Sequence, residues 1–232
     1  MSVEELDSWL WALRTPIVSC YAIFERGGVT LVDANVAGQD EAILSALAER
    51  LGVAERAVPV RQILLTHAHA DHFGSAGAIA AGTRAEVIGP AAEAAVFAGR
   101  QQLAQPDLRD WERQLYEQTM PRVPAAPPVT LDRVLEAGDA LDWEVEARLI
   151  AAPGHTPGQL AVWVPEHETL IAGDALATHE GRPIVGVFNI DSDEATRSAT
   201  ALLELEPRRL CVGHGETLTG DIAQQFQSPR SG

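Results

Sequence analysis

The segment Thr66-His67-Ala68-His69-Ala70-Asp71-His72 holds three of the seven histidines in this 232-residue sequence. The mostly apolar run 60–65 comes directly before it and predicts a short, buried strand. Residues two apart on an extended segment point to the same side, so His67 and His69 can bind one ion. Asp71 and His72 follow on the expected turn and can face a second ion. Because imidazole and carboxylate groups are common zinc ligands, the segment indicates a metal site at a strand end.

Three later segments also place a polar side chain directly after a predicted strand. His155 stands in the turn 153–158, Asp174 follows the run 170–173, and His214 lies between two glycines. Glycine allows a sharp turn and a close approach of the backbone to a ligand. Sites in layered α/β proteins collect at strand ends, so we expect these three side chains to join the first cluster.

The first half of the sequence alternates between strand and helix patterns. The expected elements are a hairpin of strands 17–25 and 29–33, a helix 40–51, a strand 60–65, a helix 74–81, a strand 86–88 and a helix 90–98 opened by Pro90. This alternation predicts an α/β layered architecture.

The second half begins with strand patterns and includes one clear helix. We expect strands at 134–135, 144–150, 160–164, 169–172 and 209–212, a helix at 193–205 with Ala195, Ala199, Leu202 and Leu203 inward, and a helical turn at 222–226. Residues 100–128 are helical in character over 100–120 and rich in proline afterwards. We interpret them as an insertion near the site, which either shapes substrate access or only packs as a flap.

Composition excludes several classes of function. The net charge is −16, and all 17 basic residues are arginines without a basic cluster, which argues against nucleic acid and anionic membranes as partners. No run of 18 apolar residues predicts a membrane helix, and the acidic start is unlike a secretory signal. We therefore expect a cytoplasmic protein with a small-molecule substrate.

Cys20 and Cys211 are expected to be buried free thiols. The oligomeric state stays open, because Trp9 and Trp11 can pack on the first hairpin or on a second subunit.

The motif order His-x-His-x-Asp-His, Gly-His-Thr-x-Gly, Gly-Asp and Gly-His-Gly resembles the metallo-β-lactamase superfamily, from the first hairpin to Gly215. The resemblance implies one domain over residues 1–232, an α/β four-layer αβ/βα sandwich with a metal site at the edge between two mixed β-sheets. It also implies the ligands: His67, His69 and His155 for one metal, Asp71, His72 and His214 for the second, and Asp174 as the bridge. Of the remaining histidines, His167 is expected to be solvated, and His179 is a candidate for substrate contact.

Two cations in such a site, expected to be Zn²⁺ with iron or manganese as alternatives, can share one water and lower its pKa to about 7. A metal-bridging hydroxide would then attack an electrophilic centre. Asp71 would orient this nucleophile or pass a proton to the leaving group, and Asp174 would hold both cations. The sequence thus predicts a di-metal hydrolase for a small ester, thioester or lactone.

Differences between this sequence and known branches of the superfamily reduce the number of expected substrate classes. The commonest zinc β-lactamases carry cysteine where Asp174 stands, and acyl-homoserine lactonases have a tyrosine soon after this position, where residues 175–178 are Ala-Leu-Ala-Thr. Glyoxalase II enzymes add a helical domain with basic residues, whereas this sequence ends soon after His214 and has no lysine, so a glutathione thioester is a weaker expectation. The alternatives are an iron-dependent oxidoreductase resembling sulfur dioxygenases, and a non-catalytic metal-binding regulatory protein.

Overall fold

The computed structural model describes residues 1–226. The chain divides into two compact units, one formed by Met1–Gln102 with Arg122–Leu135 and the other by Leu103–Pro121 with the residues from Glu136 onward. A single domain over 1–232 stays a prediction. Among the described residues, no helix has the length and apolar character needed to cross a membrane.

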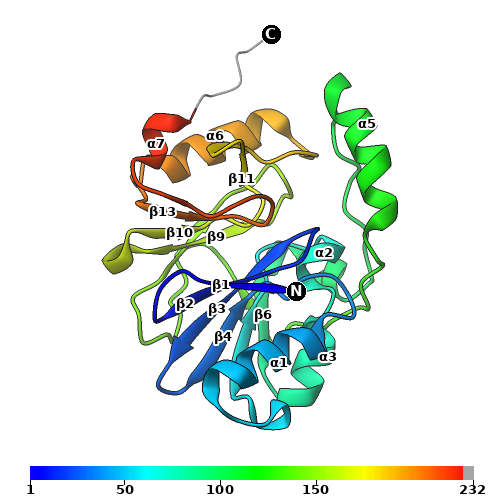
Figure 1. Cartoon of the computed structure of the whole chain (residues 1–232). Helices are drawn as coiled ribbons and strands as arrows, with labels where there is room; N and C mark the ends of the chain where they lie inside the picture. Colours follow the sequence, from blue (N-terminus) through cyan, green and yellow to red (C-terminus); the bar gives the residue numbers. More distant parts are fainter. Residues whose placement is uncertain (227–232) are drawn as a thin grey trace. The chain divides into compact units, whose positions relative to one another are not determined.

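The first unit is built on a seven-stranded mixed sheet in the order β1 to β7 (Figure 1). Its strands are β1 (Ser2–Glu5), β2 (Leu10–Arg14), β3 (Ser19–Glu25), β4 (Gly28–Val32), β5 (Val60–Leu64), β6 (Glu86–Pro90) and β7 (Arg133–Leu135). β1 to β4 pair antiparallel, whereas β4 to β7 pair parallel. The parallel strands therefore bring their carboxyl ends, and the loops that follow them, to the same edge of this sheet.

The hairpin predicted at 17–33 is confirmed as β3 and β4, joined at Arg26 and Gly27. Strands β1 and β2, which extend this sheet at its start, were not predicted from the sequence. Trp11 on β2 packs edge-on against Phe24 of β3, with ring centroids 5.2 Å apart, so Trp11 packs on the hairpin. The strand predicted at 134–135 is confirmed as β7, but its assignment to the second half was wrong, because β7 pairs with β6 in the first sheet.

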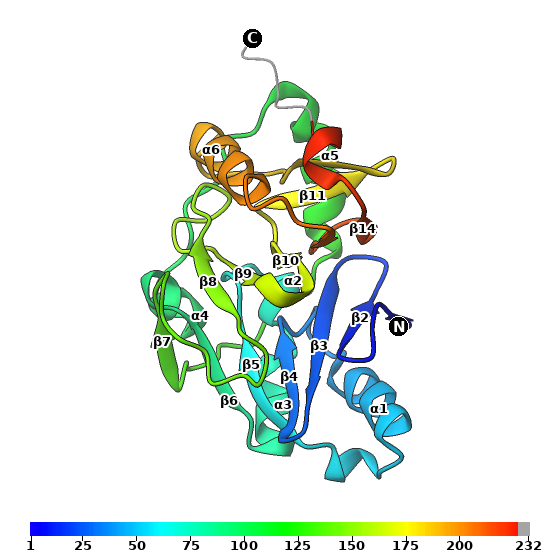
Figure 2. The ribbon, with the colours of Figure 1, turned by 90° about the vertical axis from the view of Figure 1, so that its left-hand side faces the viewer.

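Helices α1 and α3 lie on one side of this sheet (Figures 1 and 2). The predicted helix at 40–51 is α1 (Asp40–Leu51), which ends at Gly52 in the left-handed conformation with a φ of 66°. The predicted helix at 74–81 is α3 (Ala76–Thr83), preceded by the short α2 (Ala70–Phe73). Helix 90–98 is shorter than predicted: Pro90 ends β6, a 3-10 turn follows at Ala91–Glu93, and α4 spans Ala94–Phe97. A second 3-10 turn, Glu55–Ala57, leads into β5.

The second unit contains a five-stranded sheet in the order β14-β13-β10-β9-β8. Its strands are β8 (Arg148–Ala151), β9 (Leu160–Val164), β10 (Thr169–Ile171), β13 (Arg209–Cys211) and β14 (Leu218–Thr219), and a separate hairpin holds β11 (Leu176–His179) and β12 (Arg182–Val185). This hairpin and β14 were not predicted from the sequence. The predicted start of β8 at residue 144 is four residues early, because only Arg148–Ala151 pairs with β9.

Helix α6 (Ser192–Leu203) covers this sheet, and α7 (Ile222–Gln225) follows β14 (Figure 1). The Asp191 side chain caps α6 by accepting the N–H of Glu194 at 2.8 Å. The four residues predicted to face inward are buried in one apolar cluster with strand residues such as Leu170 and Leu210. That prediction is confirmed, and a 3-10 turn at Pro165–His167 joins β9 to β10.

The predicted helical stretch 100–120 is helical only over α5 (Asp110–Thr119), which a 3-10 turn at Met120–Arg122 ends. Pro106 lacks a backbone N–H and stands four residues before α5, which is one reason why the helix does not begin earlier.

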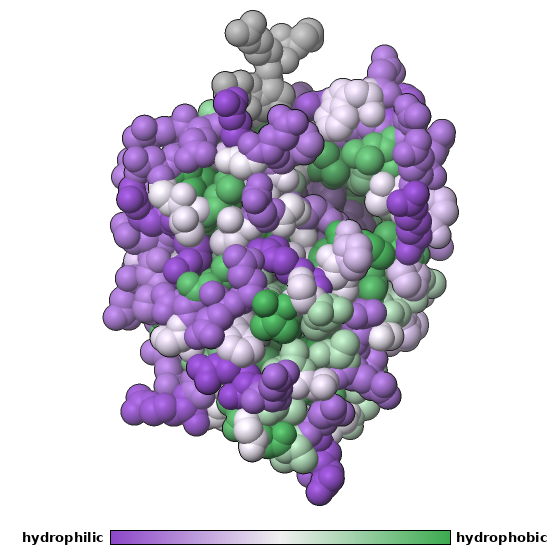
Figure 3. Space-filling model, viewed as in Figure 1, coloured by the Kyte–Doolittle hydropathy of each residue, from purple (hydrophilic) through white to green (hydrophobic). Residues whose placement is uncertain are grey.

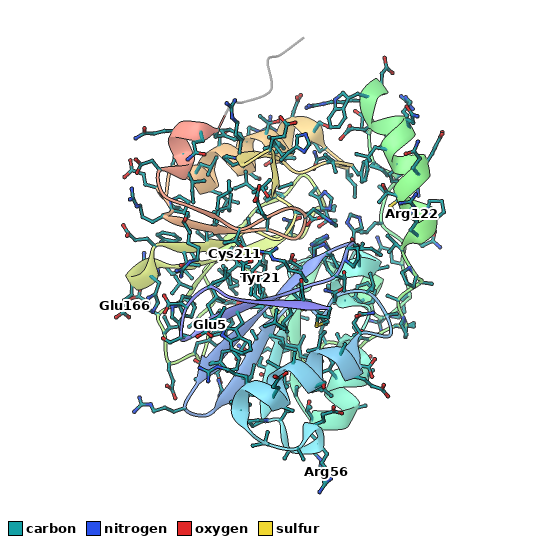
Figure 4. The ribbon with its side chains drawn as sticks, in the orientation of Figure 1. Glu5, Tyr21, Arg56, Arg122, Glu166 and Cys211 are labelled. Atoms are coloured by element: carbon teal, nitrogen blue, oxygen red, sulfur yellow. The ribbon has the colours of Figure 1, made fainter. Side chains whose placement is uncertain are left out.

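Both cysteines are buried thiols, as predicted, and neither forms a disulfide. Figure 4 shows Cys211 inside the second unit and Tyr21 inside the first, whereas charged residues at the surface include Glu5, Arg56, Arg122 and Glu166. Hydrophilic side chains cover most of the face in Figure 3, with smaller apolar areas between them, as expected for a net charge of −16.

Candidate metal centre

The first cluster of donor side chains follows β5 in the first unit. His67 is fully buried, and its Nε2 lies 3.1 Å from Nδ1 of His69. The ring of His72, which α2 supplies, lies 4.2 Å from the His67 ring between centroids. The ligand atoms of Asp71 and His72 are within 4.8 Å of each other. The structure therefore gathers all four donors of the histidine motif.

A buried carboxylate behind this cluster orients it. Asp33 follows β4 with a φ of 63°, and its Oδ2 lies 2.8 Å from Nδ1 of His72. The same carboxylate accepts the N–H of Thr66 at 2.8 Å and its hydroxyl at 2.9 Å. An acceptor on Nδ1 fixes the imidazole tautomer and leaves Nε2 as the metal-binding nitrogen. Asp33 thus positions His72 and the start of the motif.

A second buried carboxylate holds the peptide between two of the donors. Glu93 is 1% exposed, and its Oε2 accepts the N–H of Ala68 at 2.6 Å. Ala68 separates His67 from His69, so this hydrogen bond fixes the backbone from which both imidazoles project. A charge-assisted hydrogen bond of this kind is about twice as strong as a neutral one.

The second cluster lies in the second unit and centres on Asp174. Its Oδ2 is 3.4 Å from Nε2 of His155 and 3.1 Å from Nε2 of His214. Asp174 and His155 are buried, whereas the His214 side chain is 33% exposed. One carboxylate oxygen therefore faces two imidazoles that come from different loops.

Two glycines allow these loops to pack tightly. A Cβ on Gly186 would overlap the carbonyl oxygen of Asp174, and a Cβ on Gly154 would overlap the backbone of Ala195. Gly154 also has a φ of 124°, which side chains rarely adopt. The loop that carries His155 therefore needs glycine at 154, and the segment that packs against Asp174 needs it at 186.

All seven predicted ligands offer an imidazole nitrogen or a carboxylate oxygen. A donor set of five imidazoles and two carboxylates suits zinc, and it also suits iron. The residues present thus fit the kind of metal that the resemblance implies, with four donors gathered in the first unit and three in the second.

The two remaining histidines lie apart from these clusters in sequence. His179 ends β11, and its side chain is 73% exposed, with Nε2 at 3.9 Å from Oε1 of Glu180. His167 is half-buried in the 3-10 turn before β10. A role for His179 in substrate contact stays a prediction.

Asp33 and Glu93 were not predicted from the sequence as parts of the site. Asp33 carried a detectable signal, since it is an acidic residue directly after an apolar strand, like Asp174. Glu93 carried none, because it stands in an ordinary helical pattern 25 residues from Ala68.

A family model described as the metallo-beta-lactamase superfamily matches residues 13–214. The uncharacterized protein YobT of Bacillus subtilis (strain 168) is 30% identical over 222 residues, which cover 91% of this chain and 88% of that protein. The hydroxyacylglutathione hydrolase of Rhodobacter capsulatus is 32% identical over 70% of this chain, which spans about half (51%) of that enzyme.

Solved structures share the fold. The metallo-beta-lactamase family protein TTHA1429 from Thermus thermophilus superposes with a TM-score of 0.69 at 26% identity, over 95% of this chain and 77% of that one. TTHA1623, solved in a di-iron-bound form, gives a TM-score of 0.63 at 25% identity, over 89% of this chain and 92% of that one. These similarities confirm the fold class that the sequence predicts.

Proposed function

Because this chain belongs to the metallo-beta-lactamase superfamily, we propose that it is a hydrolase that binds two metal ions, with zinc as the expected metal. The superfamily match supports a metal-dependent hydrolase in general, and a probable metallo-hydrolase of Bacillus subtilis, YflN, is 27% identical over 84% of this chain. The number of metals, their identity and the substrate are the proposed part.

The observation that carries the proposal is the position of Asp174 between two imidazoles. Its Oδ2 faces Nε2 of both His155 and His214 within 3.4 Å. A carboxylate in this position suits a ligand shared by two cations. In the proposed site, His155 would serve one cation with His67 and His69. His214 would serve the other cation with Asp71 and His72.

Two bound divalent cations would activate water at neutral pH and stabilise negative charge on the substrate. The chain's own residues would have distinct tasks. Asp33 keeps His72 in one tautomer, and Glu93 keeps His67 and His69 in place. Asp71 is half-buried at the start of α2, where its carboxylate can accept a proton from water and donate it to the leaving group.

We propose a small ester, thioester or lactone as the substrate. The similarity to hydroxyacylglutathione hydrolases, whose names indicate thioester cleavage, supports the thioester among these. The net charge of −16 argues against strongly anionic substrates and nucleic acid.

The proposal is tested on protein purified without added metal. We expect about two zinc ions per chain and hydrolysis of at least one member of a panel of p-nitrophenyl esters, acyl thioesters and γ-lactones. A chelator should abolish this activity, and added Zn²⁺ should restore it. The Asp174→Ala variant serves as the inactive control for contaminating esterases.

Iron is the specific alternative, because TTHA1623 was solved in a di-iron-bound form. About one iron per chain, or two as in TTHA1623, together with oxygen uptake on thiol or persulfide substrates, would replace the hydrolase proposal with an oxidoreductase. Bound metal without turnover of any substrate in the panel would favour a regulatory protein.

A further inference from the structure

The segment 186–191, here called the strap, joins β12 to α6 and hydrogen-bonds to the loops of two proposed ligands. The N–H of Ile190 donates to the carbonyl of His155 at 3.3 Å, and the N–H of Asp191 donates to that of Gly154 at 2.9 Å. At the other end, Gly186 donates to Ala175, the residue after Asp174, at 3.3 Å. The strap therefore lies directly against the His155 and Asp174 loops.

Helix α5 and the residues before it attach to the same strap. The N–H of Asp107 donates to the carbonyl of Asn189 at 2.8 Å, and the Tyr116 ring packs edge-on against Phe188 at 5.1 Å between centroids. In Figure 1 the loop that leads into α6 reaches toward α5. The strap is thus the link between α5 and the His155–Asp174 cluster.

Glu112 is the central contact of this link. Glu112 is 2% exposed, and its carboxylate accepts the N–H of Phe188 at 3.0 Å and that of Arg109 at 2.8 Å. Phe188 has a φ of 61°, an uncommon conformation that persists only where its surroundings enforce it. Glu112 therefore caps the first turn of α5 through Arg109, and the same carboxylate holds the strap through Phe188.

The exposed face of α5 is apolar next to this link. Trp111 is 58% exposed and Leu115 is 43% exposed, one helical turn apart on one face. This face lies about 100° around the helix from Glu112 and Tyr116. Large apolar side chains exposed together are typical of a binding surface.

We propose that Trp111 and Leu115 form the recognition surface for the apolar acyl chain of the substrate, and that Glu112 positions it through the strap. The proposal rests on the proposed hydrolase function and adds the substrate class: a neutral ester or thioester with a medium-length alkyl chain. The acidic residues Asp110 and Glu117 on α5, and the net charge of −16, disfavour an acyl group that is itself anionic.

An acyl chain fits this face better than a second copy of the chain does. A stable protein interface needs about 800 Å² and about 20–30 residues from each partner. The face offers two large side chains, flanked by the charged or polar Arg113, Gln114 and Gln118, all of them exposed. An alkyl chain of about eight carbons is of the size that two such side chains can cover.

The experiment compares p-nitrophenyl acetate with p-nitrophenyl octanoate. The double variant Trp111→Gln/Leu115→Gln should lower kcat/KM for the octanoate by about tenfold and leave the acetate within about twofold. Leu51→Gln is the matched control, because Leu51 is also an exposed leucine on a helix but lies in the first unit. Metal content should be unchanged in both variants.

Glu112→Ala should raise KM for the octanoate by a similar factor while kcat for the acetate stays close to wild type. Glu112→Gln keeps one carbonyl acceptor and should restore part of the loss. A merely structural role would instead reduce kcat/KM for both substrates by similar factors.

Binding without turnover separates this inference from the hydrolase proposal. Calorimetric titration should show octanamide binding to the wild type at least about tenfold more tightly than acetamide, and the double variant should lose the difference. If no ester is cleaved but octanamide binding depends on Trp111, the hydrolase proposal fails and the recognition surface stands. Equal losses on both esters, or a wild-type dimer that the double variant converts to a monomer, would overturn the recognition surface.

Discussion

Nδ1 of His72 lies 2.8 Å from Oδ2 of Asp33, and both side chains are buried. Asp33 stands 39 residues before His72, directly after β4, and α2 carries His72. The pair shows that the histidine motif depends on a residue outside it. A carboxylate on the far nitrogen of a metal-binding imidazole raises its basicity and fixes its orientation.

Asp33→Asn should therefore weaken zinc binding by about 10–100-fold. The amide keeps the shape of the carboxylate. Its NH₂ group, however, would face a hydrogen-bond donor of Thr66 or His72 from which the Asp33 carboxylate accepts. The free energy of unfolding should fall by about 1–3 kcal/mol. Competition with a zinc-chelating dye and urea unfolding measure the two effects. Asp132→Asn is the control, since Asp132 is exposed and accepts the backbone N–H of Val87. Wild-type zinc affinity in Asp33→Asn would contradict the orienting role.

Asp174→Ala should lose most of the bound metal and the activity together. The substitution removes the oxygen that faces His155 and His214, and it leaves two imidazoles without their shared carboxylate. Elemental analysis after dialysis should show less than about half of the wild-type metal content. Asp139→Ala, at an exposed turn, is the control. Undiminished metal content in Asp174→Ala would rule out the bridging position.

Gly186→Ala tests how tightly the strap packs on Asp174. The added Cβ would overlap the Asp174 carbonyl oxygen, so the backbone must move, at a cost of about 1–3 kcal/mol. Gly82→Ala is the matched control: it lies within α3 with no atom near the added Cβ, and it should stabilise by about 0.5–1 kcal/mol. Urea unfolding measures both changes. Equal stabilities of the two variants would show that the strap can move away from Asp174 without a cost in stability.

The sequence predicted those helices and strands whose apolar pattern and end residues all lie within one short segment. Helix α1 was predicted at its observed bounds, because its apolar face, its acidic start and Gly52 all fall within 13 residues. The hairpin β11–β12 was missed because each strand has only four residues, with Pro183 within β12. The apolar run before each ligand similarly located the donors at strand ends.

Other features depend on partners that are distant in the sequence. Glu93 contacts Ala68 across 25 residues, and Glu112 contacts Phe188 across 76 residues. Neither carboxylate differs locally from a solvated helix residue, so only the tertiary structure reveals that both are buried acceptors. The place of β7 in the first sheet was missed for the same reason, because the insertion separates β7 from its partner β6 in the sequence.

Cys20 should be almost unreactive in the folded protein. Burial, and next the negative charge of Asp33, raise the pKa of its thiol from 9.0 to about 12. At pH 8 the thiolate fraction should therefore be about a thousandfold lower than in the unfolded chain, and alkylation by iodoacetamide should slow accordingly. Mass spectrometry of native and urea-unfolded samples distinguishes Cys20 from Cys211.

The same pKa makes stability depend on pH with a definite sign. Because the folded value lies above the unfolded one, the contribution of the neutral thiol is fully present below about pH 9 and is lost as pH rises toward 12. The free energy of unfolding of the wild type should thus decline relative to that of Cys20→Ala above pH 9. A constant difference between pH 7 and 11 would contradict the raised pKa.

Glu93→Gln separates the charge of Glu93 from its hydrogen bond. The glutamine carbonyl can still accept the N–H of Ala68, so the fold and the backbone between His67 and His69 should persist. What is lost is a buried negative charge beside the proposed cation site, and zinc affinity should fall by about tenfold while Tm stays close to the wild-type value. Glu93→Ala should lose about 1–3 kcal/mol of stability as well, because the N–H of Ala68 is then left without its acceptor. Glu86→Gln is the control for a neutralised carboxylate in the same unit, since Glu86 pairs with Arg133 and lies outside the donor cluster. If Glu93→Gln binds zinc like the wild type while Glu93→Ala does not, the carboxylate acts through its hydrogen bond alone.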